Sequence, residues 1–509
     1  MRWISGGPDL PPKLLQSLED GRLVFFCGAG ISYPAGLPTF RGLVEAVYQH
    51  LGQRMEGLEQ LEFEKQNYDR VFSLLERRMT GTFVRRAVIQ ILSIPQGADL
   101  PSHRALLTLG TSRERVCRLV TTNFDRGFEH VAGGEVAIEA APKLSVPKLG
   151  SWNCVVHLHG IINERDPDGR SLVLSSADFG AAYLTERWAS RFIGDLFRRF
   201  TVLFVGYSVE DPVIRYMMDA FAADRALGEG VGAAYVLASA NDIGLKAASD
   251  AWEAKGVIPI LYDDRDRHAA LHLSLAKWAD AHRSGLFGKE SIVRGFGSSK
   301  RPSKPFADDP EVSQLVWAIS EPSGRAAQVY SQLEPLPPIE WLEVFAREGL
   351  LTGAVVSTEE HHWTPLVDQG YRTKDANRLH PVARALCAWL ARHLDSPALL
   401  EWIYSAGASL HTEFQIEISR QLVQSPALSG GQRAIWEALA ADPSLVWTPS
   451  QHYYRLSQRL SAADRWSLSL KNEILGALAP RLALAGVYKI LRSAATNLDG
   501  RAVYEQRLV

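Results

Sequence analysis

The sequence predicts an α/β domain, in which helices cover both faces of a parallel sheet, followed by an all-α C-terminal domain. Over residues 1–285, short apolar runs alternate with helical patterns, which is typical of parallel sheets. Residues 286–310 are rich in Gly, Ser, Pro and Lys, so they predict a linker. Over residues 311–509 only helical patterns recur, and eight of the 13 tryptophans lie there, which indicates a folded core.

Six short apolar segments predict the strands of the sheet, because strands buried on both faces read as continuous apolar runs. They are Leu23–Cys27, Val116–Thr121, Cys154–Leu158, Val202–Val205, Ala234–Leu237 and Val257–Leu261. Between the first two, apolar residues spaced three and four apart predict a long helical insertion within residues 42–109. A last amphipathic helix at Ala269–His282 closes the domain.

Composition excludes some classes of protein. The net charge is −2, which does not favour a nucleic-acid or membrane-surface partner through bulk electrostatics. No apolar run approaches the roughly 18 residues that a membrane helix needs, and the N-terminus has no signal-peptide pattern. The four cysteines form no C-x-x-C pair and predict reduced core thiols, not a disulfide framework or a zinc site. We therefore expect a cytoplasmic protein without a membrane partner or a bound metal.

The strand Leu23–Cys27 ends at Gly28-Ala29-Gly30, followed by Ile31-Ser32. Glycines can take positive φ and leave no Cβ in the way, so backbone N–H groups at this turn could close on a pyrophosphate. A plain strand-to-loop turn is the alternative, because an isolated G-x-G is weak evidence.

Two further strand ends carry polar residues. Asn123 and Asp125 follow the second strand, where an α/β sheet binds ligands, although a simple Asx turn or helix N-cap fits as well. His157 and His159 alternate with Leu158 and would point the same way. A metal site lacks an obvious third ligand there. His159 suits a general base, because the pKa of histidine lies near neutral pH; a strand-end histidine bonded to backbone is the alternative.

The strand Val202–Val205 ends at Gly206-Tyr207-Ser208, and Asp211-Pro212 follows. Ser208 could bind a phosphate or a ribose hydroxyl. Asp211 is a further candidate for the binding site, or only the N-cap of a predicted helix at Val213–Phe221.

The four strand-end motifs, taken together and in this order, resemble the sirtuin superfamily over roughly residues 10–285. They are Gly28–Ser32 with Ala35–Arg41, then Thr121–Asp125, then Leu158–Gly160, then Gly206–Ser208. The resemblance implies a Rossmann-like parallel sheet that binds NAD, and it does not cover the helical C-terminal half.

Departures from the family bear on the reaction. Deacylating sirtuins carry a zinc module with two C-x-x-C pairs after the His-Gly, whereas residues 161–183 contain no cysteine. Thr39, Thr122 and Tyr207 stand where the family has Asp, Gln and Thr. The sequence looks more like the zinc-less branch of bacterial antiphage defence, whose members hydrolyse NAD and often add a helical C-terminal region.

The resemblance also implies roles for the site residues. The pyrophosphate would lie on the first glycine turn with two serines, close to the second glycine turn and Asp211; these residues are Gly28, Ala29, Gly30, Ser32, Gly206, Ser208 and Asp211. Phe40 and Arg41 would lie on a loop that closes over the nicotinamide side. Asn123 would fix a ribose hydroxyl or the attacking water, Asp125 would support the loop or the carboxamide pocket, and His159 would polarise a ribose hydroxyl or the water.

The predicted function is an NAD glycohydrolase that yields nicotinamide and ADP-ribose without zinc, a regulated effector of abortive infection by NAD depletion. The alternatives are an NAD-dependent protein deacylase or ADP-ribosyltransferase, and a non-catalytic NAD or ADP-ribose sensor. We expect the helical half to bind a protein or nucleic-acid trigger or a partner subunit, and to support a homo-oligomer. The chain stops at Val509 soon after a helical segment, which would also fit a piece of a longer protein.

Overall fold

The computed structural model describes residues 1–95, 97–209, 211, 214, 216–217, 232–239, 244–302, 306, 309–352, 363–368, 379–406, 409–424, 428 and 430–440. Contacts divide the chain into two compact units, Met1–Gly285 and Leu286–Val509. Among the described residues, no helix combines the length and the apolar character that crossing a membrane requires.

The first unit is built on a seven-stranded, fully parallel sheet with the order β3-β4-β2-β1-β5-β6-β7. The strands are β1 (Leu23–Cys27), β2 (Arg118–Thr121), β3 (Ile138–Ala140), β4 (Cys154–His157), β5 (Thr201–Val205), β6 (Ala234–Ser239) and β7 (Ile258–Tyr262). The predicted α/β class is therefore confirmed, and all six predicted strands are present with ends shifted by two residues or fewer. The prediction missed the edge strand β3, whose three half-buried residues do not form an apolar run.

Helices cover both faces of the sheet, as the burial of every residue in β1 requires. Successive side chains of a strand point to opposite faces. Val24 and Phe26 join the core cluster that contains Phe192 of α9 (Trp188–Arg199). Phe25 meets Trp278 of α12 (Arg265–Phe296) edge to face, with 5.6 Å between ring centroids.

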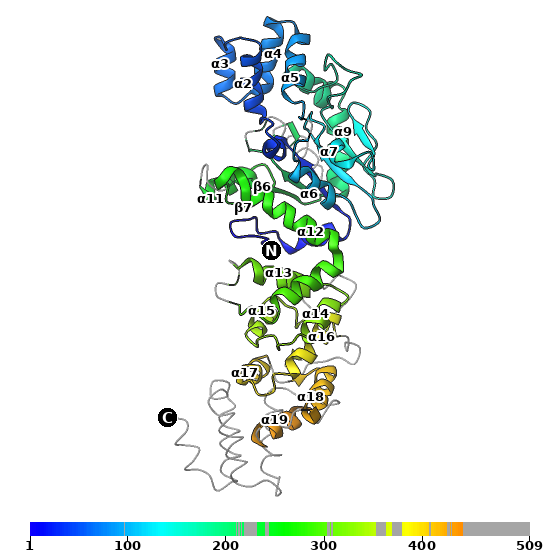
Figure 1. The fold of residues 1–509 in the computed structure, drawn as a ribbon, viewed down its shortest axis with the longest axis vertical. Coiled ribbons are helices and arrows are strands. Elements are labelled where there is room, and N and C mark those ends of the chain that lie inside the picture. The colour runs from blue at the N-terminus through cyan, green and yellow to red at the C-terminus, as the bar shows by residue number, and fades with distance from the viewer. Residues whose placement is uncertain are drawn as a thin grey trace. The chain divides into compact units, whose positions relative to one another are not determined.

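A helical insertion between β1 and β2 gathers into a module of its own, visible as the cluster of α2 to α5 in Figure 1. It consists of α2 (Phe40–His50), α3 (Leu58–Glu64), α4 (Tyr68–Arg78) and α5 (Gly81–Ile91). Its core includes Val47, Phe72 and Val84, and also Leu172 and Leu174 from the loop after β4. The insertion thus packs against a segment that lies more than 80 residues later in the sequence.

Shorter elements complete the first unit: α1 (Pro12–Glu19), the 3₁₀ helix η1 (Ala29–Ala35), α6 (Pro101–Leu109), α7 (Gly127–Ala132), α8 (Ser176–Gly180), the π-helix η2 (Ala181–Thr185) and α11 (Leu245–Glu253). The predicted helix Val213–Phe221 lies largely outside the described residues.

The described part of the second unit is mainly helical around one core, as predicted. It contains α13 (Pro310–Ile319), α14 (Arg325–Ser331), α15 (Trp341–Arg347), α16 (Pro381–Ala391), α17 (Pro397–Ser405), α18 (Thr412–Gln424), α19 (Gly430–Ala440) and a short antiparallel pair, β8 (Val367–Asp368) with β9 (Ser409–Leu410). Trp341, Trp389 and Trp436 are fully buried there. The predicted helix Arg465–Leu478 lies outside the described residues.

The expected linker at 286–310 differs from the structure at its start. α12 breaks at Gly285, where φ is 54° and ψ is −131°, and then continues to Phe296. Val293 is fully buried in the core of the second unit. The Gly- and Ser-rich composition begins only at Gly295, so residues 286–294 retain enough apolar side chains to form and bury a helix.

Candidate functional site

Two adjoining pockets open at the carboxyl ends of the strands. The inner pocket encloses about 60 Å³ and the outer one about 790 Å³, and both are lined by Ala29, Thr39, Phe40 and Asp211. The outer volume lies within the usual range of small-molecule sites, about 300–1,000 Å³. Of the predicted site residues, all but Gly28 line a pocket. The inner one is lined by Ala29, Ser32, Phe40, Asn123, Asp125, His159 and Asp211. The outer one is lined by Ala29, Gly30, Phe40, Arg41, Gly206, Ser208 and Asp211.

The two glycine turns pack backbone against backbone. Gly28 N–H donates to Val205 O at 2.9 Å, and Gly30 N–H donates to Gly206 O at 3.0 Å. A Cβ at Gly30 would lie 2.8 Å from Gly206 Cα, and Gly206 has a φ of +79°. The sequence-based expectation that these N–H groups face a pyrophosphate is therefore wrong for Gly28 and Gly30, whose N–H groups are occupied. Their lack of a side chain instead allows the ends of β1 and β5 to meet.

Asn123 is fixed by a hydrogen-bond network at the floor of the inner pocket. Its Nδ2 donates to Ser32 Oγ at 3.0 Å and to Gly28 O at 3.2 Å. Ser32 Oγ in turn donates to Asp125 Oδ2 at 2.8 Å. The sequence-based expectation is that Ser32 binds the pyrophosphate. In the structure Ser32 is only 2% exposed, and its hydroxyl supports Asn123 instead.

Asp125 is a buried carboxylate with three partners. Besides Ser32, it accepts from Gly127 N–H at 2.9 Å and lies 3.5 Å from His103 Nε2. Burial alone would raise the pKa of Asp125, but the hydrogen bond and charge of His103, together with Gly127 and Ser32, hold it below its usual value. His103 was not predicted, because it comes from α6 and meets the site only through tertiary packing.

His159 lies at the inner pocket with its ring shielded from water. It is 2% exposed, and its Nε2 is 2.9 Å from the Tyr183 hydroxyl. Phe179 and Tyr183 both meet the imidazole edge to face. Burial lowers the pKa of His159 to about 3. The expected pKa near neutrality is therefore wrong for this conformation, because the surrounding aromatic rings do not solvate an imidazolium.

His157 does not line either pocket, although strand alternation predicted that it points with His159. Its Nδ1 is 3.0 Å from Asn123 O, and its Nε2 is 3.4 Å from Glu129 Oε1 of α7. His157 is fully buried, so its contact is with the backbone of Asn123 beneath the pocket.

Two departures from the family pattern form a pair. The Thr122 hydroxyl is 2.7 Å from the Tyr207 hydroxyl, which also donates to Cys27 O at 3.1 Å. The Tyr207 ring lies against the first glycine turn, where a Cβ at Gly28 would approach it to 2.8 Å. Thr122 and Tyr207 lie 85 residues apart in the sequence, and only the fold shows that they are partners.

Phe40 and Arg41 begin α2 and do not form a closing loop. Thr39 is the N-cap, and its Oγ1 accepts from Gly42 N–H at 3.3 Å, so the helix starts at Phe40. Phe40 packs on Phe72, with 5.9 Å between centroids, and lines both pockets. Arg41 is exposed, pairs with Glu45 at 3.3 Å and faces the outer pocket.

Among the described residues, no cysteine lines either pocket. All four cysteines are buried, and burial raises the pKa of Cys117 to about 11 and that of Cys154 to about 12. In the part of the chain that the structure describes, His, Cys, Asp and Glu side chains form no cluster of three or more that could hold a metal ion.

Comparison with known proteins matches part of the chain that carries this geometry. Residues 118–260 match the model of a SIR2-like domain. The chain therefore contains a SIR2-like domain, which supports its membership of the sirtuin superfamily. The matched range includes Asn123, His159 and Gly206, and the sheet inserts β1 with its glycine turn between β2 and β5. A SIR2-like domain implies the binding or use of NAD.

One relative is similar to nearly the whole of this chain. The uncharacterized protein y4cA of Sinorhizobium fredii (strain NBRC 101917 / NGR234) is 29% identical over 504 residues, which cover 96% of this chain. The same alignment covers 39% of y4cA, so the chain spans about two fifths of the length of that relative.

Proposed function

We propose that this protein is an NAD glycohydrolase that cleaves NAD to nicotinamide and ADP-ribose. The observation that carries the proposal is that Asn123 and His159 line the same small inner pocket, which adjoins a pocket large enough for the rest of a dinucleotide. The carboxyl ends of strands in an open α/β sheet are the usual place for such a ligand.

The release of nicotinamide from NAD requires no general acid. Nicotinamide leaves NAD as a neutral base, so the enzyme must stabilise an oxocarbenium-like ribose and position a water molecule. The amide nitrogen of Asn123 donates to Ser32 and Gly28, which orients the whole side chain. Its side-chain oxygen would accept a hydrogen bond from the attacking water or from a ribose hydroxyl.

His159 would act as a neutral hydrogen-bonding group. Its low pKa keeps the imidazole uncharged at physiological pH. A neutral imidazole can accept a hydrogen bond from a ribose hydroxyl or from the water, and it adds no positive charge beside an oxocarbenium. Asp125 would serve indirectly, by fixing Ser32 and hence Asn123.

The outer pocket would hold the pyrophosphate and the adenosine. The ligand would pass from Ala29 toward Gly206 and Ser208, and then along the ends of β6 and β7, because these strands follow β5 in the sheet.

With no cysteine between residues 161 and 183, the segment after His159 offers no thiolate ligands for a zinc module of the deacylase kind.

The test is a direct assay. The purified chain is incubated with NAD, with and without an acyl-peptide, and nicotinamide and ADP-ribose are followed by chromatography. Turnover without peptide, lost in Asn123→Ala and His159→Ala and kept in the matched control Asn163→Ala, supports the proposal. Asn163 is a suitable control because it bonds only within its own loop and lines neither pocket. Turnover that requires the peptide would show a deacylase instead.

The biological role proposed here is that of a regulated effector in antiphage defence, as in the zinc-less branch that the motifs resemble. Uncontrolled loss of NAD would harm the host, so the helical second unit would sense a trigger, bind a partner or build an oligomer. Size-exclusion chromatography with light scattering, with and without NAD, tests the oligomer; a monomer under both conditions would contradict it.

A further inference from the structure

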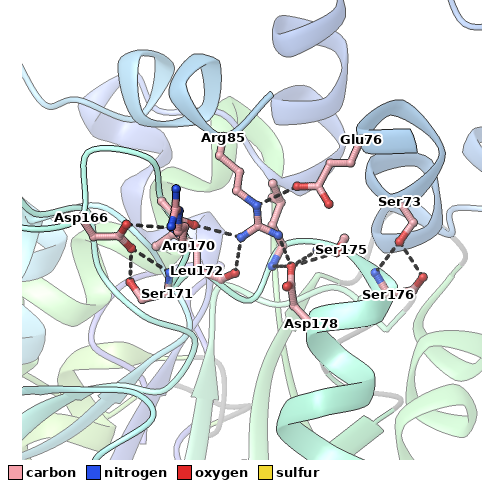
Figure 2. Close-up of polar contacts among 12 residues, drawn as sticks. Ser73, Glu76, Arg85, Asp166, Arg170, Ser171, Leu172, Ser175, Ser176 and Asp178 are labelled. Atoms are coloured by element: carbon pink, nitrogen blue, oxygen red, sulfur yellow. Dashed lines mark hydrogen bonds and ion pairs between the residues drawn. The ribbon is translucent and has the colours of Figure 1, made fainter. Parts of the chain in front are cut away.

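Arg85 of α5 is bonded to four acceptors from three parts of the first unit (Figure 2). Its Nε donates to Glu76 Oε1 of α4 at 2.7 Å, and one terminal nitrogen donates to Asp178 Oδ2 at 2.6 Å. The other terminal nitrogen donates to the carbonyl oxygens of Gly169 and Leu172, each at 2.9 Å. The side chain is 11% exposed, so the guanidinium joins the helical module to the segment after β4 in a largely dry setting.

The geometry of these contacts requires arginine. A guanidinium presents five donors in a rigid fork, whereas a lysine ammonium is a point charge on a flexible stem. Burial alone would lower the pKa of Arg85, but Asp178 and Glu76 raise it above its usual value, so the charge is balanced by two carboxylates. Removing the guanidinium would leave both carboxylates without their cation in this setting, which is strongly unfavourable.

Asp178 also bonds to the backbone at the start of α8. Its Oδ2 also accepts from Leu174 N–H at 3.1 Å and from Ser175 N–H at 2.8 Å, and it completes a capping box with Ser175. Ser73 of α4 adds a second attachment, because its Oγ accepts from Ser176 N–H at 3.0 Å (Figure 2). The first turn of α8 is thus fixed to the helical module at two points.

Residues 172–183 contact both the main chain and the imidazole ring of His159. Leu172 O accepts from Arg85, and the next residue, Val173, donates its N–H to His159 O at 2.9 Å. Phe179 of α8 packs on the imidazole with 5.1 Å between centroids, and beyond α8 the Tyr183 hydroxyl lies 2.9 Å from Nε2. Tyr183 belongs to the π-helix η2, a rare element that often occurs at functional sites.

We propose that Arg85 is a positioning residue of the NAD site, which fixes the segment from Gly169 to Tyr183 over His159 and so sets the place and the shielding of the imidazole. The proposal rests on the proposed function for its catalytic consequence. Its structural half, that Arg85 sets the position and shielding of His159, can be tested without any turnover of NAD.

The first experiment measures the accessibility of His159 in the full chain. Diethyl pyrocarbonate modifies exposed imidazoles, and mass spectrometry gives the rate at each histidine. We expect Arg85→Met to raise the rate at His159 roughly 10- to 100-fold, because breaking a partly buried ion pair favours local opening. Arg86→Met is the matched control: Arg86 is the next residue of α5, and it is exposed and bonded to Asp168 of the same loop.

A second buried histidine makes this result decisive. His103 is 1% exposed, but it belongs to the network of Asp125 and not to the segment that Arg85 holds. Faster modification of His159 alone supports the proposal. An unchanged rate at His159, or an equal rise at His103, overturns it, because Arg85 would then have no specific link to His159.

The second experiment separates positioning from binding. In Arg85→Met, and more weakly in Asp178→Asn, we expect kcat for NAD cleavage to fall roughly 10- to 100-fold, because a small misplacement of a catalytic group is costly. The Kd of ADP-ribose, measured by calorimetry, should change by less than about threefold. An equal loss of affinity and turnover contradicts a positioning role. If the wild type cleaves no NAD, the proposed function fails, while the accessibility of His159 still decides the structural half.

Discussion

Asn123 depends on residues that are distant in the sequence. Ser32 comes from η1 and Asp125 from the loop after β2, and their hydroxyl and carboxylate complete the network that orients the Asn123 amide. Because Ser32 is buried, no water molecule can easily replace its hydroxyl. The orientation of Asn123 is therefore a property of the network and not of the residue alone.

Substitution of Ser32 tests this network. Ser32→Ala removes one of the two acceptors of Asn123 Nδ2 and the hydroxyl that donates to Asp125 Oδ2, which leaves that buried carboxylate oxygen without its donor. We expect a loss of about 1–3 kcal/mol in the free energy of unfolding and roughly a tenfold fall in kcat. Urea denaturation and steady-state kinetics measure both, with Ser93→Ala as an exposed control that loses a bond to the carbonyl oxygen of Ile89 in α5. A variant of wild-type activity would show that Asn123 needs no such support.

The low pKa of His159 predicts a pH dependence of stability. The folded pKa, about 3, lies below the unfolded value of about 6.5, so the unfolded chain binds more protons between these values. Stability therefore rises with pH across this window, with a slope approaching about 1.4 kcal/mol per pH unit from this group. Above pH 6.5 the contribution is constant.

Comparison with His159→Gln isolates this effect. His272, whose pKa is lowered to about 4 by burial and by His268, contributes with the same sign in both proteins and cancels in the difference. Chemical denaturation between pH 7 and pH 5 should show that the variant loses less stability than the wild type. Parallel curves for the two proteins would mean that His159 is not held neutral.

Residue positions were more predictable than residue environments. Asn123, Asp125 and His159 could be placed at strand ends, because short apolar runs mark the strands and ligands bind at their carboxyl ends. The neutral state of His159 could not be predicted, because it depends on Phe179 and Tyr183, which reach the imidazole only through the fold. His103 left no local signal for the same reason.

At the scale of elements, the contact between the ends of β1 and β5 sets the shape of the outer pocket. Gly30 and Gly206 approach each other so closely that neither tolerates a side chain. The Gly30 N–H donates to Gly206 O, which fixes the two turns to each other.

An alanine at this contact should separate the two turns. We expect Gly30→Ala to cost about 1–3 kcal/mol of stability, as overpacking does, and to weaken the binding of ADP-ribose. Gly150→Ala is the matched control, because a Cβ there meets no atom within 4 Å. Thermal unfolding and calorimetry distinguish the two variants. Equal stability and affinity would show that the turns can move apart without consequence.

The elements themselves could be predicted where their pattern is strong. The six central strands read as apolar runs, whereas β3 is a three-residue edge strand without one. The start of α2 at Phe40 was missed because the family motif suggested a loop, although Thr39 is an ordinary N-cap. The helix over residues 286–296 was missed because the glycines and serines that follow dominated the composition of that range.

At the scale of the whole molecule, both pockets are lined by residues of the first unit. A ligand that binds only the folded state stabilises it in proportion to the logarithm of its concentration. We therefore expect ADP-ribose at a hundred times its Kd to add about 2.7 kcal/mol to the free energy of unfolding of the first unit. Hydrogen exchange of β1 and β5 amides reports this gain, and unchanged exchange at saturating ADP-ribose would place the ligand elsewhere.

The most direct test of the central claim is NAD cleavage in heavy-oxygen water. If the chain is a glycohydrolase, nicotinamide forms without any acyl-peptide, and the ADP-ribose released carries one heavy oxygen at the former nicotinamide-bearing carbon, as mass spectrometry would show. Asn123→Ala should give neither product. Nicotinamide that appears only with an acyl-peptide, or ADP-ribose that becomes attached to protein instead of gaining the heavy oxygen, would contradict the account.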